Sequence, residues 1–223
     1  MMSSVLGIDY GGTDTKLLVS DDGARTVIPS GNLDELATQV QHFVNAHPVE
    51  RFAVTVAGTL DTETGIVGKS TNMPWLDGLA PAKILEAKLG IPGLAVQDGI
   101  AAATAEANLG AGRGADDVFV IALGTGVAGA HLVGGEPRAG AHGGAGEIGH
   151  IYVGGDHHCS CGQVGCLETF IGGSSLPLRW AERGGPTQSR AEDVFAAGAA
   201  GDADAGRAAV SGRAGRAVVR DAG

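Results

Sequence analysis

Cysteine is scarce in this chain, and all of it lies in one short segment. The 223 residues contain three cysteines, Cys159, Cys161 and Cys166. A disulfide framework needs pairs, and a bridge between Cys159 and Cys161 would be strained, so a disulfide-stapled fold is excluded. Three clustered thiols instead indicate a structural Zn²⁺ site that takes a fourth ligand from elsewhere. The simpler alternative is a loop that holds three reduced thiols.

Long apolar runs and an excess of positive charge are also absent. No stretch approaches the roughly 18 apolar residues of a membrane span, and the N-terminus lacks the pattern of a signal peptide. We therefore expect a cytoplasmic protein with no membrane partner. The formal charge of −10 argues against a nucleic-acid partner and favours small-molecule chemistry.

The first half of the chain alternates between strand and helix patterns. A glycine-rich bend joins two strand-like segments, and an amphipathic helix and a further strand follow. The expected elements are strands at 5–9, 16–20, 52–57 and 93–96, and helices at 32–46, 81–89 and 100–109. This order predicts an α/β domain over residues 1–112.

A second unit begins with another strand and turn. The run 117–123 reads as a buried strand, and 127–133 reads as its hairpin partner, so residues 113–223 form a second expected α/β domain. Because both units open with a strand, a Gly/Thr turn and a return strand, we expect a cleft between them. From about Arg190 the chain is rich in Ala, Gly and Arg, which predicts a poorly anchored tail or a cut-off domain.

Two glycine-rich turns are candidates for binding phosphate. Asp9-Tyr10-Gly11-Gly12-Thr13 places a carboxylate before two glycines and a hydroxyl, so backbone N–H groups could surround phosphate oxygens while Asp9 faces Mg²⁺. Gly124-Thr125-Gly126 is a second such turn. Each alone also fits an ordinary hairpin turn. Together they favour a phosphate chain held from two sides.

Asp98 and the segment around Glu147 carry the remaining polar candidates. Asp98 follows a strand and precedes a helix, so it fits both a helix cap and a general base for phosphoryl transfer to an alcohol. Glycines surround Glu147 and His150 and would let the backbone pass close to a ligand. His150 could supply the fourth zinc ligand, and His157 or His158 could do so instead.

At this point the chain resembles the ROK family of sugar kinases over about residues 5–180. Four segments match family motifs in order: Asp9-x-Gly-Gly-Thr13, Leu123-Gly-Thr-Gly126, Glu147-x-Gly-His150 and Cys159-x-Cys-Gly-x-x-Gly-Cys166-x-Glu168. The last is the most specific. The resemblance implies an actin-like ATPase (ribonuclease H-like) two-domain sugar kinase fold with an interdomain cleft and an incomplete second domain.

The resemblance also implies a role for each matching residue. Zinc would be held by His150, Cys159, Cys161 and Cys166. The sugar would be bound by Asn72, Asp98, Glu147, His150 and Glu168, with Asp98 as the catalytic base. The nucleotide and its Mg²⁺ would be bound by Asp9, Gly11, Gly12, Thr13, Gly124, Thr125 and Gly126. A homodimer is the expected assembly.

The implied activity is ATP-dependent phosphorylation of a hexose at its 6-hydroxyl, with glucose first. N-acetylmannosamine, N-acetylglucosamine, fructose or allose are alternative acceptors, and polyphosphate is an alternative donor. Gln97-Asp98-Gly99-Ile100 departs from the family's Asn-Asp-x-Asn, which removes an amide beside the sugar. The family also includes sugar-responsive repressors that keep the sugar pocket, so a non-catalytic sugar-binding regulator is one alternative. Because the chain stops before the family's adenosine motif, an inactive truncated kinase is another.

Overall fold

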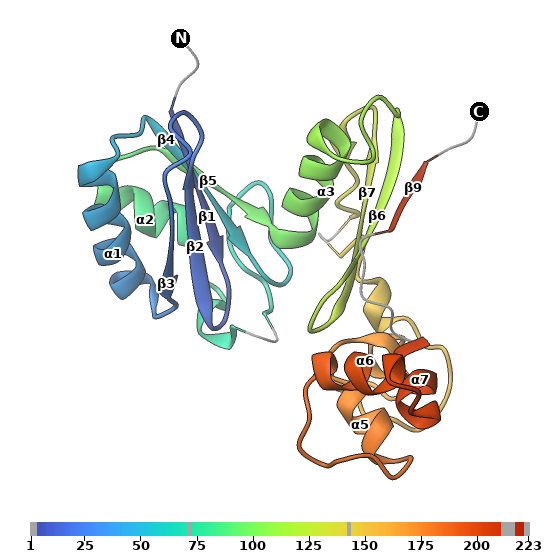
Figure 1. The fold of residues 1–223 in the computed structure, drawn as a ribbon. Coiled ribbons are helices and arrows are strands. Elements are labelled where there is room, and N and C mark those ends of the chain that lie inside the picture. The colour runs from blue at the N-terminus through green and yellow to red at the C-terminus, as the bar shows by residue number, and fades with distance from the viewer. Residues whose placement is uncertain (1–3, 71–72, 142–143, 211–216, 221–223) are drawn as a thin grey trace. The chain divides into compact units, whose positions relative to one another are not determined.

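Two units make up the fold, and each is described by itself. The computed structural model describes residues 4–70, 73–141, 144–210 and 217–220 (Figure 1). The first unit ends at Ala101 and the second begins at Ala102, apart from a short stretch after Gly140. Helix α3 (Asp98–Leu109) spans that boundary. The domain limits expected at 112 and 113 stay a prediction.

The first unit is built on a five-stranded sheet in the order β3-β2-β1-β4-β5. Its strands are β1 (Val5–Tyr10), β2 (Asp14–Val19), β3 (Arg25–Pro29), β4 (Arg51–Val56) and β5 (Gly93–Gln97). Strands β1 to β3 pair antiparallel, whereas β1, β4 and β5 run parallel. Buried and exposed positions alternate along β2, as expected for a strand whose successive side chains point to opposite faces of the sheet. Sequence patterning missed β3, which is short and lies at the edge.

Helices α1 (Leu33–Ala46) and α2 (Pro81–Leu89) pack together on one face of this sheet (Figure 1). The Asn32 side-chain oxygen accepts the N–H groups of Asp34 and Glu35, and the Asn32 N–H donates to the Glu35 carboxylate. This capping box starts α1 at the residue that sequence patterning predicts. The buried face carries Leu33, Leu36, Ala37, Val40 and Val44.

The second unit contains a four-stranded antiparallel sheet in the order β8-β7-β6-β9. Its strands are β6 (Asp117–Leu123), β7 (Val127–Val133), β8 (Glu136–Pro137) and β9 (Ala217–Arg220). The β6–β7 hairpin has the bounds expected from the sequence. Ala103 of α3 packs into the small core of this sheet with Val118, Val120, Ala130 and Leu132.

Helices follow the hairpin in the described part of the chain, and the last two of them correct the expectation of a poorly anchored tail as far as residue 210. The helices are α4 (Glu168–Ile171), α5 (Leu176–Ala181), α6 (Ala191–Ala199) and α7 (Ala203–Val210). Val194 of α6 and Ala205 of α7 are buried against Trp180 of α5. Gly206, one of the glycines that argued against helix, lies where α6 and α7 meet: a Cβ added at Gly198 would be 3.1 Å from the Gly206 Cα atom.

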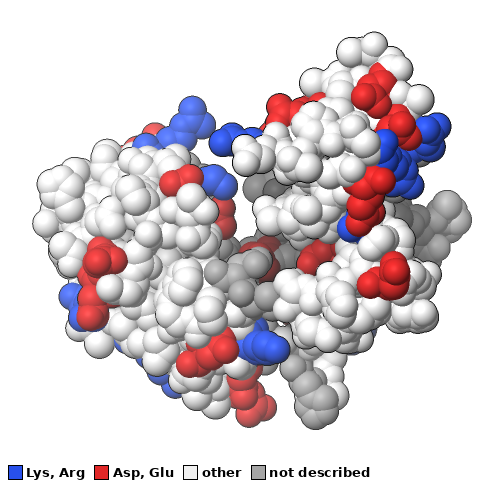
Figure 2. All heavy atoms as spheres, turned by 90° about the horizontal axis from the view of Figure 1, so that it is seen from below, with Lys and Arg blue, Asp and Glu red and all other residues white. Residues whose placement is uncertain are grey.

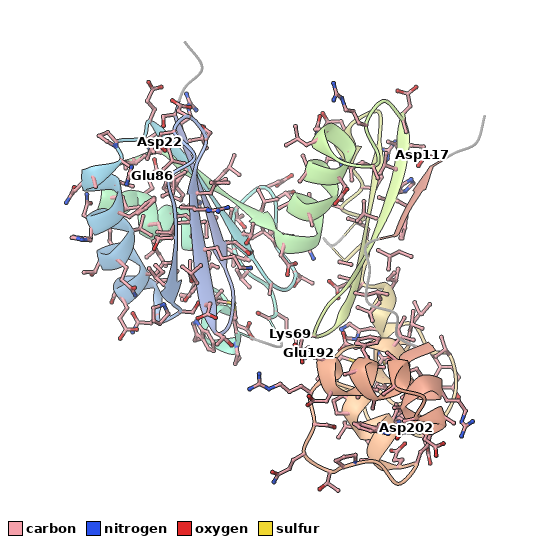
Figure 3. The ribbon with its side chains drawn as sticks, in the orientation of Figure 1. Asp22, Lys69, Glu86, Asp117, Glu192 and Asp202 are labelled. Atoms are coloured by element: carbon pink, nitrogen blue, oxygen red, sulfur yellow. The ribbon has the colours of Figure 1, made fainter. Side chains whose placement is uncertain are left out.

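The start of α7 has a local signal that sequence patterning overlooked. Asp202 lies just before the helix (Figure 3), and its Oδ1 atom accepts the N–H groups of Asp204 and Ala205 at 2.9 and 2.7 Å. Gly201, with φ +99°, makes the preceding turn. An aspartate cap and a left-handed glycine therefore set the α6–α7 turn.

Charged side chains show no large patch of one sign on the face drawn in Figure 2, where acidic and basic residues are interspersed. Among the described residues, no helix combines the length and the apolar character that crossing a bilayer would require.

Candidate functional site

The first glycine-rich turn joins β1 to β2 and carries Asp9 at the end of β1. Thr55 and Lys16 lie on the strands either side of it. Thr55 Oγ1 donates to Asp9 Oδ1 at 3.0 Å, and Lys16 Nζ lies 3.2 Å from Asp9 Oδ2. The carboxylate is thus oriented by neighbouring strands while its side chain stays 55% exposed. An oriented, accessible carboxylate could ligate a hard cation.

Close backbone approach explains one glycine of this turn. A Cβ added at Gly11 would lie 2.7 Å from the carbonyl oxygen of Asp14, so a side chain cannot fit without moving the backbone. Thr13 is also fixed, because its carbonyl oxygen accepts the N–H of Ser30 at 2.9 Å. The turn is therefore tied to the strand end at β3 rather than hanging free.

Tyr10 links the end of β1 to the segment around Trp75, which residue patterns alone did not predict. The Tyr10 side chain is buried, its hydroxyl donates to the Gly31 carbonyl, and the Trp75 indole N–H donates to the Tyr10 oxygen at 3.3 Å. Burial raises the pKa of Tyr10, and the bond from Trp75 offsets part of that rise. The nearby candidate Asn72 lies outside the described residues.

Asp98 opens α3 immediately after β5 and is exposed. Its Oδ1 atom accepts the N–H of Gly99 at 2.8 Å. Gln97 Oε1 accepts the N–H of Ile100 at 2.9 Å, so the residue before Asp98 contributes a cap as well. A strand end that presents an exposed carboxylate at a helix start is a suitable place for a general base, and the catalytic role of Asp98 stays a prediction.

The second glycine-rich turn lies between β6 and β7 and is held by the segment before α5. Gly173 N–H donates to the Gly124 carbonyl at 2.8 Å. Ser174 donates to the Thr125 carbonyl through its N–H at 3.0 Å and through Oγ at 2.9 Å. These bonds fix the carbonyl groups of the turn from outside the hairpin.

Glu168 closes the other side of this turn. Its Oε2 atom accepts the N–H of Val127, the first residue of β7, at 2.8 Å. A Cβ added at Gly126 would lie 2.3 Å from the same oxygen, so the glycine makes room for the carboxylate. The structure therefore gives Glu168 a positioning contact that the sequence did not reveal, and its predicted role toward sugar stays untested.

The Glu147 and His150 segment lies against β7 because two glycines let it approach. A Cβ at Gly146 would be 2.0 Å from the Gly129 carbonyl oxygen, and one at Gly149 would be 2.1 Å from the Val127 carbonyl oxygen. The short helix η2 (Ile148–His150) follows. His150 Nε2 then lies 3.8 Å from Glu147 Oε2. The fold therefore brings the Glu147 and His150 side chains close together.

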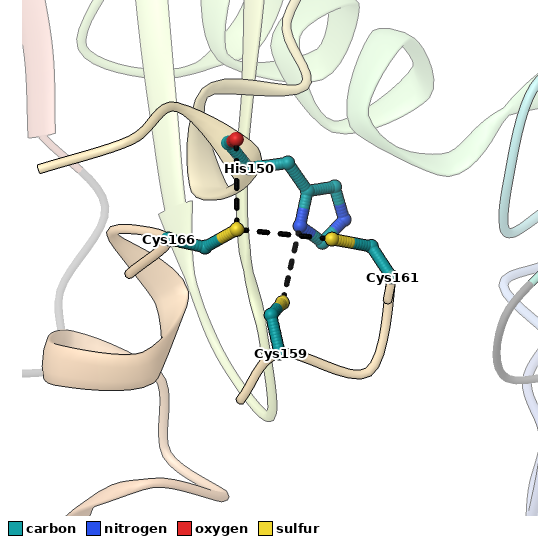
Figure 4. A group of neighbouring side chains, drawn as sticks. All are labelled: His150, Cys159, Cys161 and Cys166. Carbon is teal, nitrogen blue, oxygen red and sulfur yellow. Dashed lines mark hydrogen bonds between the residues drawn. The ribbon is translucent and has the colours of Figure 1, made fainter. Parts of the chain in front are cut away.

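His150 and the three cysteines form one cluster (Figure 4). Their ligand atoms all lie within 4.8 Å of one another. Cys159 Sγ is 3.6 Å from His150 Nδ1, and Cys161 Sγ is 3.7 Å from Cys166 Sγ. A tetrahedral ion with bonds of the usual Zn–S and Zn–N length separates its ligand atoms by about 3.6 to 3.8 Å. The donor set and its spacing fit one four-coordinate metal ion.

A small hairpin shapes this cluster. His158 and Val164 form a β-bridge, and the Cys159 N–H donates to the Gln163 carbonyl at 2.8 Å. Gly162 and Gly165 have φ values of +95° and +76°, a left-handed backbone that favours glycine and makes the tight turns of this hairpin.

The pKa values of Cys161 and Cys166 are shifted in opposite directions. Burial and hydrogen bonds with the other two thiols raise the pKa of Cys166 to about 12. Burial also acts on Cys161, but hydrogen bonds from the Gln163 backbone and from the other thiols outweigh it and lower the pKa of Cys161. Three thiolates at these distances repel one another, so a divalent cation would stabilise them.

The other two candidate histidines lie outside the cluster. The ring of His157 packs edge-on against Phe170 at 5.1 Å between centroids. His158 is in the hairpin ladder. Among the described residues, the metal-type cluster contains His150 as its one histidine.

A cavity of about 650 Å³ adjoins the second glycine-rich turn. Leu123, Gly124 and Thr125 line one side, and residues of α5 and α6, including Glu192 (Figure 3), line the other. The lining is mainly apolar, with Ser174, Ser189 and Arg190 among its polar groups. A cavity of this size and character is typical of a small-molecule site.

Comparison with known proteins places this arrangement in a family. The model described as the ROK family matches residues 5–218. The chain belongs to the ROK family. This ROK chain is 30% identical over 207 residues to a glucokinase of Streptomyces coelicolor, covering 88% of the chain and 65% of the relative. It is 31% identical over 216 residues to an N-acetylmannosamine kinase of Escherichia coli, covering 91% and 72%.

Solved structures agree on the fold of the ROK chain. A ROK family glucokinase from Streptomyces griseus in complex with glucose and AMPPNP superposes with a TM-score of 0.80 at 26% identity, covering 93% of this chain and 75% of that one. The fold is the actin-like ATPase fold of ROK sugar kinases. The chain spans 65% of the length of the Streptomyces coelicolor relative.

Proposed function

We propose that this ROK protein phosphorylates a hexose at its 6-hydroxyl with ATP, and that glucose is the first acceptor to test. The similarity to glucokinases supports this proposal. The similarity to an N-acetylmannosamine kinase keeps the amino sugars as alternative acceptors. Fructose and allose are further alternatives because they present the same kind of hydroxyl groups.

The cavity beside Gly124 and Thr125 is the observation that supports ATP as the phosphoryl donor. Its apolar lining suits an adenine base, and the turn at its edge offers backbone N–H groups to phosphate oxygens. Gly11, Gly12 and Thr13 form the corresponding turn of the first unit. Asp9 would hold the Mg²⁺ that accompanies ATP, which neutralises charge on the phosphates when bound.

The proton of the acceptor hydroxyl is assigned to Asp98. In the proposed reaction its carboxylate accepts that proton as the hydroxyl oxygen attacks the γ-phosphorus in line, and the bond to the leaving ADP oxygen breaks. The exposed position of Asp98 at the β5–α3 junction supports access to a substrate.

Sugar hydroxyls are assigned to Glu147, His150 and Glu168, with Asn72 completing the set. The 3.8 Å approach of His150 Nε2 to Glu147 leaves Nδ1 facing Cys159. One imidazole would therefore contact metal through Nδ1 and present Nε2 to the acceptor site. Gln97 keeps an amide at the first asparagine of the family's Asn-Asp-x-Asn, whereas Ile100 replaces the second, so this chain has one fewer amide near Asp98.

We further propose that the cluster binds a structural Zn²⁺ through His150, Cys159, Cys161 and Cys166. The spacing of the four ligand atoms supports this assignment. Three sulfurs and one nitrogen with no position left for water are typical of structural zinc. The ion would hold the 157–166 hairpin against η2.

A coupled ADP-release assay with Mg-ATP and the five sugars tests the proposal. We expect sugar-dependent turnover in the purified chain and a loss of at least about 100-fold in Asp98→Asn, because the amide cannot accept the proton. A matched control, Asp77→Asn, changes a carboxylate that caps Ser70 N–H at 2.8 Å and should keep turnover. Replacing ATP by polyphosphate in one arm tests the alternative donor.

Sugar-dependent turnover that persists in Asp98→Asn would refute the general-base role of Asp98. Saturable sugar binding without ADP release would refute the kinase assignment and indicate a sugar-binding protein. Sedimentation of the same preparation tests the expected homodimer.

A further inference from the structure

Arg179 is a buried cation in α5, away from the site described above. The residue is 9% exposed. Its Nη2 atom donates to Glu182 Oε1 at 2.7 Å, one helical turn further along. Its Nε and Nη1 atoms are buried and have no hydrogen-bond partner within the part of the chain that the structure describes. The guanidinium therefore has donors to spare.

This arrangement leaves positive charge only partly balanced. A guanidinium stays protonated at any physiological pH, and buried donors without acceptors cost free energy. The Glu182 side chain is 50% exposed, so water screens the field it exerts on Arg179. An additional anion beside Arg179 would balance the charge that Glu182 leaves.

A cavity beside Arg179 brings in two more cations. It has a volume of about 390 Å³ and is lined by His157, Phe170, Arg179, Glu182, Arg183 and Arg207. Arg183 Nη1 donates to the Arg179 carbonyl at 3.1 Å, which places its head group near the cavity. Arg207 of α7 pairs with Asp204 at 2.5 Å. The lining of this cavity therefore carries three guanidinium groups and the carboxylate of Glu182, while Asp204 pairs with Arg207 from outside the lining.

A neighbouring cavity of about 470 Å³ shares His157, Arg179 and Glu182 with the first. It has two carboxylates, those of Asp156 and Glu182, against the one guanidinium of Arg179. An anion is therefore favoured in the 390 Å³ cavity, whose lining has three arginines and one carboxylate.

We propose that the Arg179, Arg183 and Arg207 cavity binds a phosphate group, either as inorganic phosphate or as the end of a small phosphate monoester. Guanidinium forks match the geometry of phosphate oxygens, and three of them suit a doubly charged group. The site is separate from the glycine-rich turns and the metal-type cluster, since no residue of either lines the cavity. It does not depend on the proposed kinase activity.

Isothermal titration calorimetry of the purified chain with inorganic phosphate, at constant ionic strength set with NaCl, tests the site. We expect one saturable binding event that Arg183→Gln/Arg207→Gln weakens at least tenfold. Both arginines are exposed, so the double variant should fold. The matched control, Arg113→Gln/Arg138→Gln, removes the same two charges from exposed positions and should stay within twofold.

Each contrary result overturns the proposal. Absence of saturable phosphate binding would show that the positive charge of Arg179 is not balanced by phosphate. Equal phosphate affinity in wild type and Arg183→Gln/Arg207→Gln would show that phosphate binds elsewhere. Equal weakening in both double variants would show that the loss of affinity follows from net charge and not from this cavity. Parallel titrations with glycerol 3-phosphate and glycerol separate the two sources, because tighter binding of the ester than of phosphate identifies a small phosphorylated metabolite.

Discussion

The Glu168 carboxylate accepts the backbone N–H of Val127 at 2.8 Å, although the two residues are 41 positions apart. Glu168 begins α4, two residues after Cys166, and Val127 begins β7, one residue after the Gly124-Thr125-Gly126 turn. The bond therefore joins the metal-type cluster segment to the second glycine-rich turn. A substitution that shifts the cluster segment should therefore also alter the position of the turn, and the reverse.

Replacing Glu168 separates its acceptor role from its size. We expect Glu168→Ala to lower the free energy of unfolding by about 1 to 3 kcal/mol, because the Val127 N–H loses its acceptor. Glu168→Gln keeps an acceptor oxygen and should cost less. Urea unfolding of both variants measures the difference, and equal losses would show that this hydrogen bond contributes little.

Loss of one cluster thiol should abolish metal binding. We expect purified wild type to contain one zinc per chain by elemental analysis and Cys161→Ser to contain none, because a hydroxyl is a poor ligand for zinc. His157→Ala is the control, since His157 packs on Phe170 and lies outside the cluster. Zinc retained in Cys161→Ser would contradict the four-ligand assignment.

Metal affinity should rise with pH. The pKa of Cys166 without metal is raised to about 12, so this thiol is protonated at neutral pH and must lose its proton to bind a cation. Protons compete with the metal more strongly as pH falls, and the apparent affinity should drop about tenfold per pH unit for each proton released. Competition with a chromophoric chelator at pH 6.5 and 8 measures this, and equal affinities would argue against thiolate ligands.

A methyl group at Gly149 should destabilise the second unit. Its Cβ would lie 2.1 Å from the Val127 carbonyl oxygen, a backbone atom that cannot rotate away. We expect Gly149→Ala to cost at least about 2 kcal/mol in unfolding free energy. At Gly144 no atom lies within 4 Å of an added Cβ, so Gly144→Ala should be nearly neutral. Similar midpoints for both variants in thermal unfolding would refute this.

The Tyr10 hydroxyl should contribute measurably to the first unit. Tyr10→Phe removes the donor to the Gly31 carbonyl and the acceptor for the Trp75 indole N–H, which we expect to cost about 1 to 2 kcal/mol. Tyr152→Phe is a suitable control because Tyr152 is 71% exposed. Urea unfolding monitored by tryptophan emission gives both values, and no difference between the two variants would show that the buried pair is not needed.

Local chemistry in the sequence determined much of this protein. The Asn32 capping box, the apolar stripe of α1 and the strand–turn–strand at 117–133 act over a few residues, so they can be recognised without any long-range contact. The spacing of Cys159, Cys161 and Cys166, with two glycines between the last two cysteines, likewise indicates a metal-binding hairpin without any long-range contact. The family motifs follow from the same short segments.

Tertiary structure alone decided the rest, because it depends on which distant residues meet. The sequence of the alanine- and glycine-rich segment after Arg190 predicts only weak helix. In the fold, Val194 is buried against Trp180, and small residues let α6 and α7 approach closely. Residue patterns left His150, His157 and His158 open as the fourth ligand and the family resemblance named His150, which the structure brings to the thiols because η2 lies on β7. The unbalanced charge of Arg179 arises from burial, which no sequence pattern records and which the packing of α5 and α7 imposes.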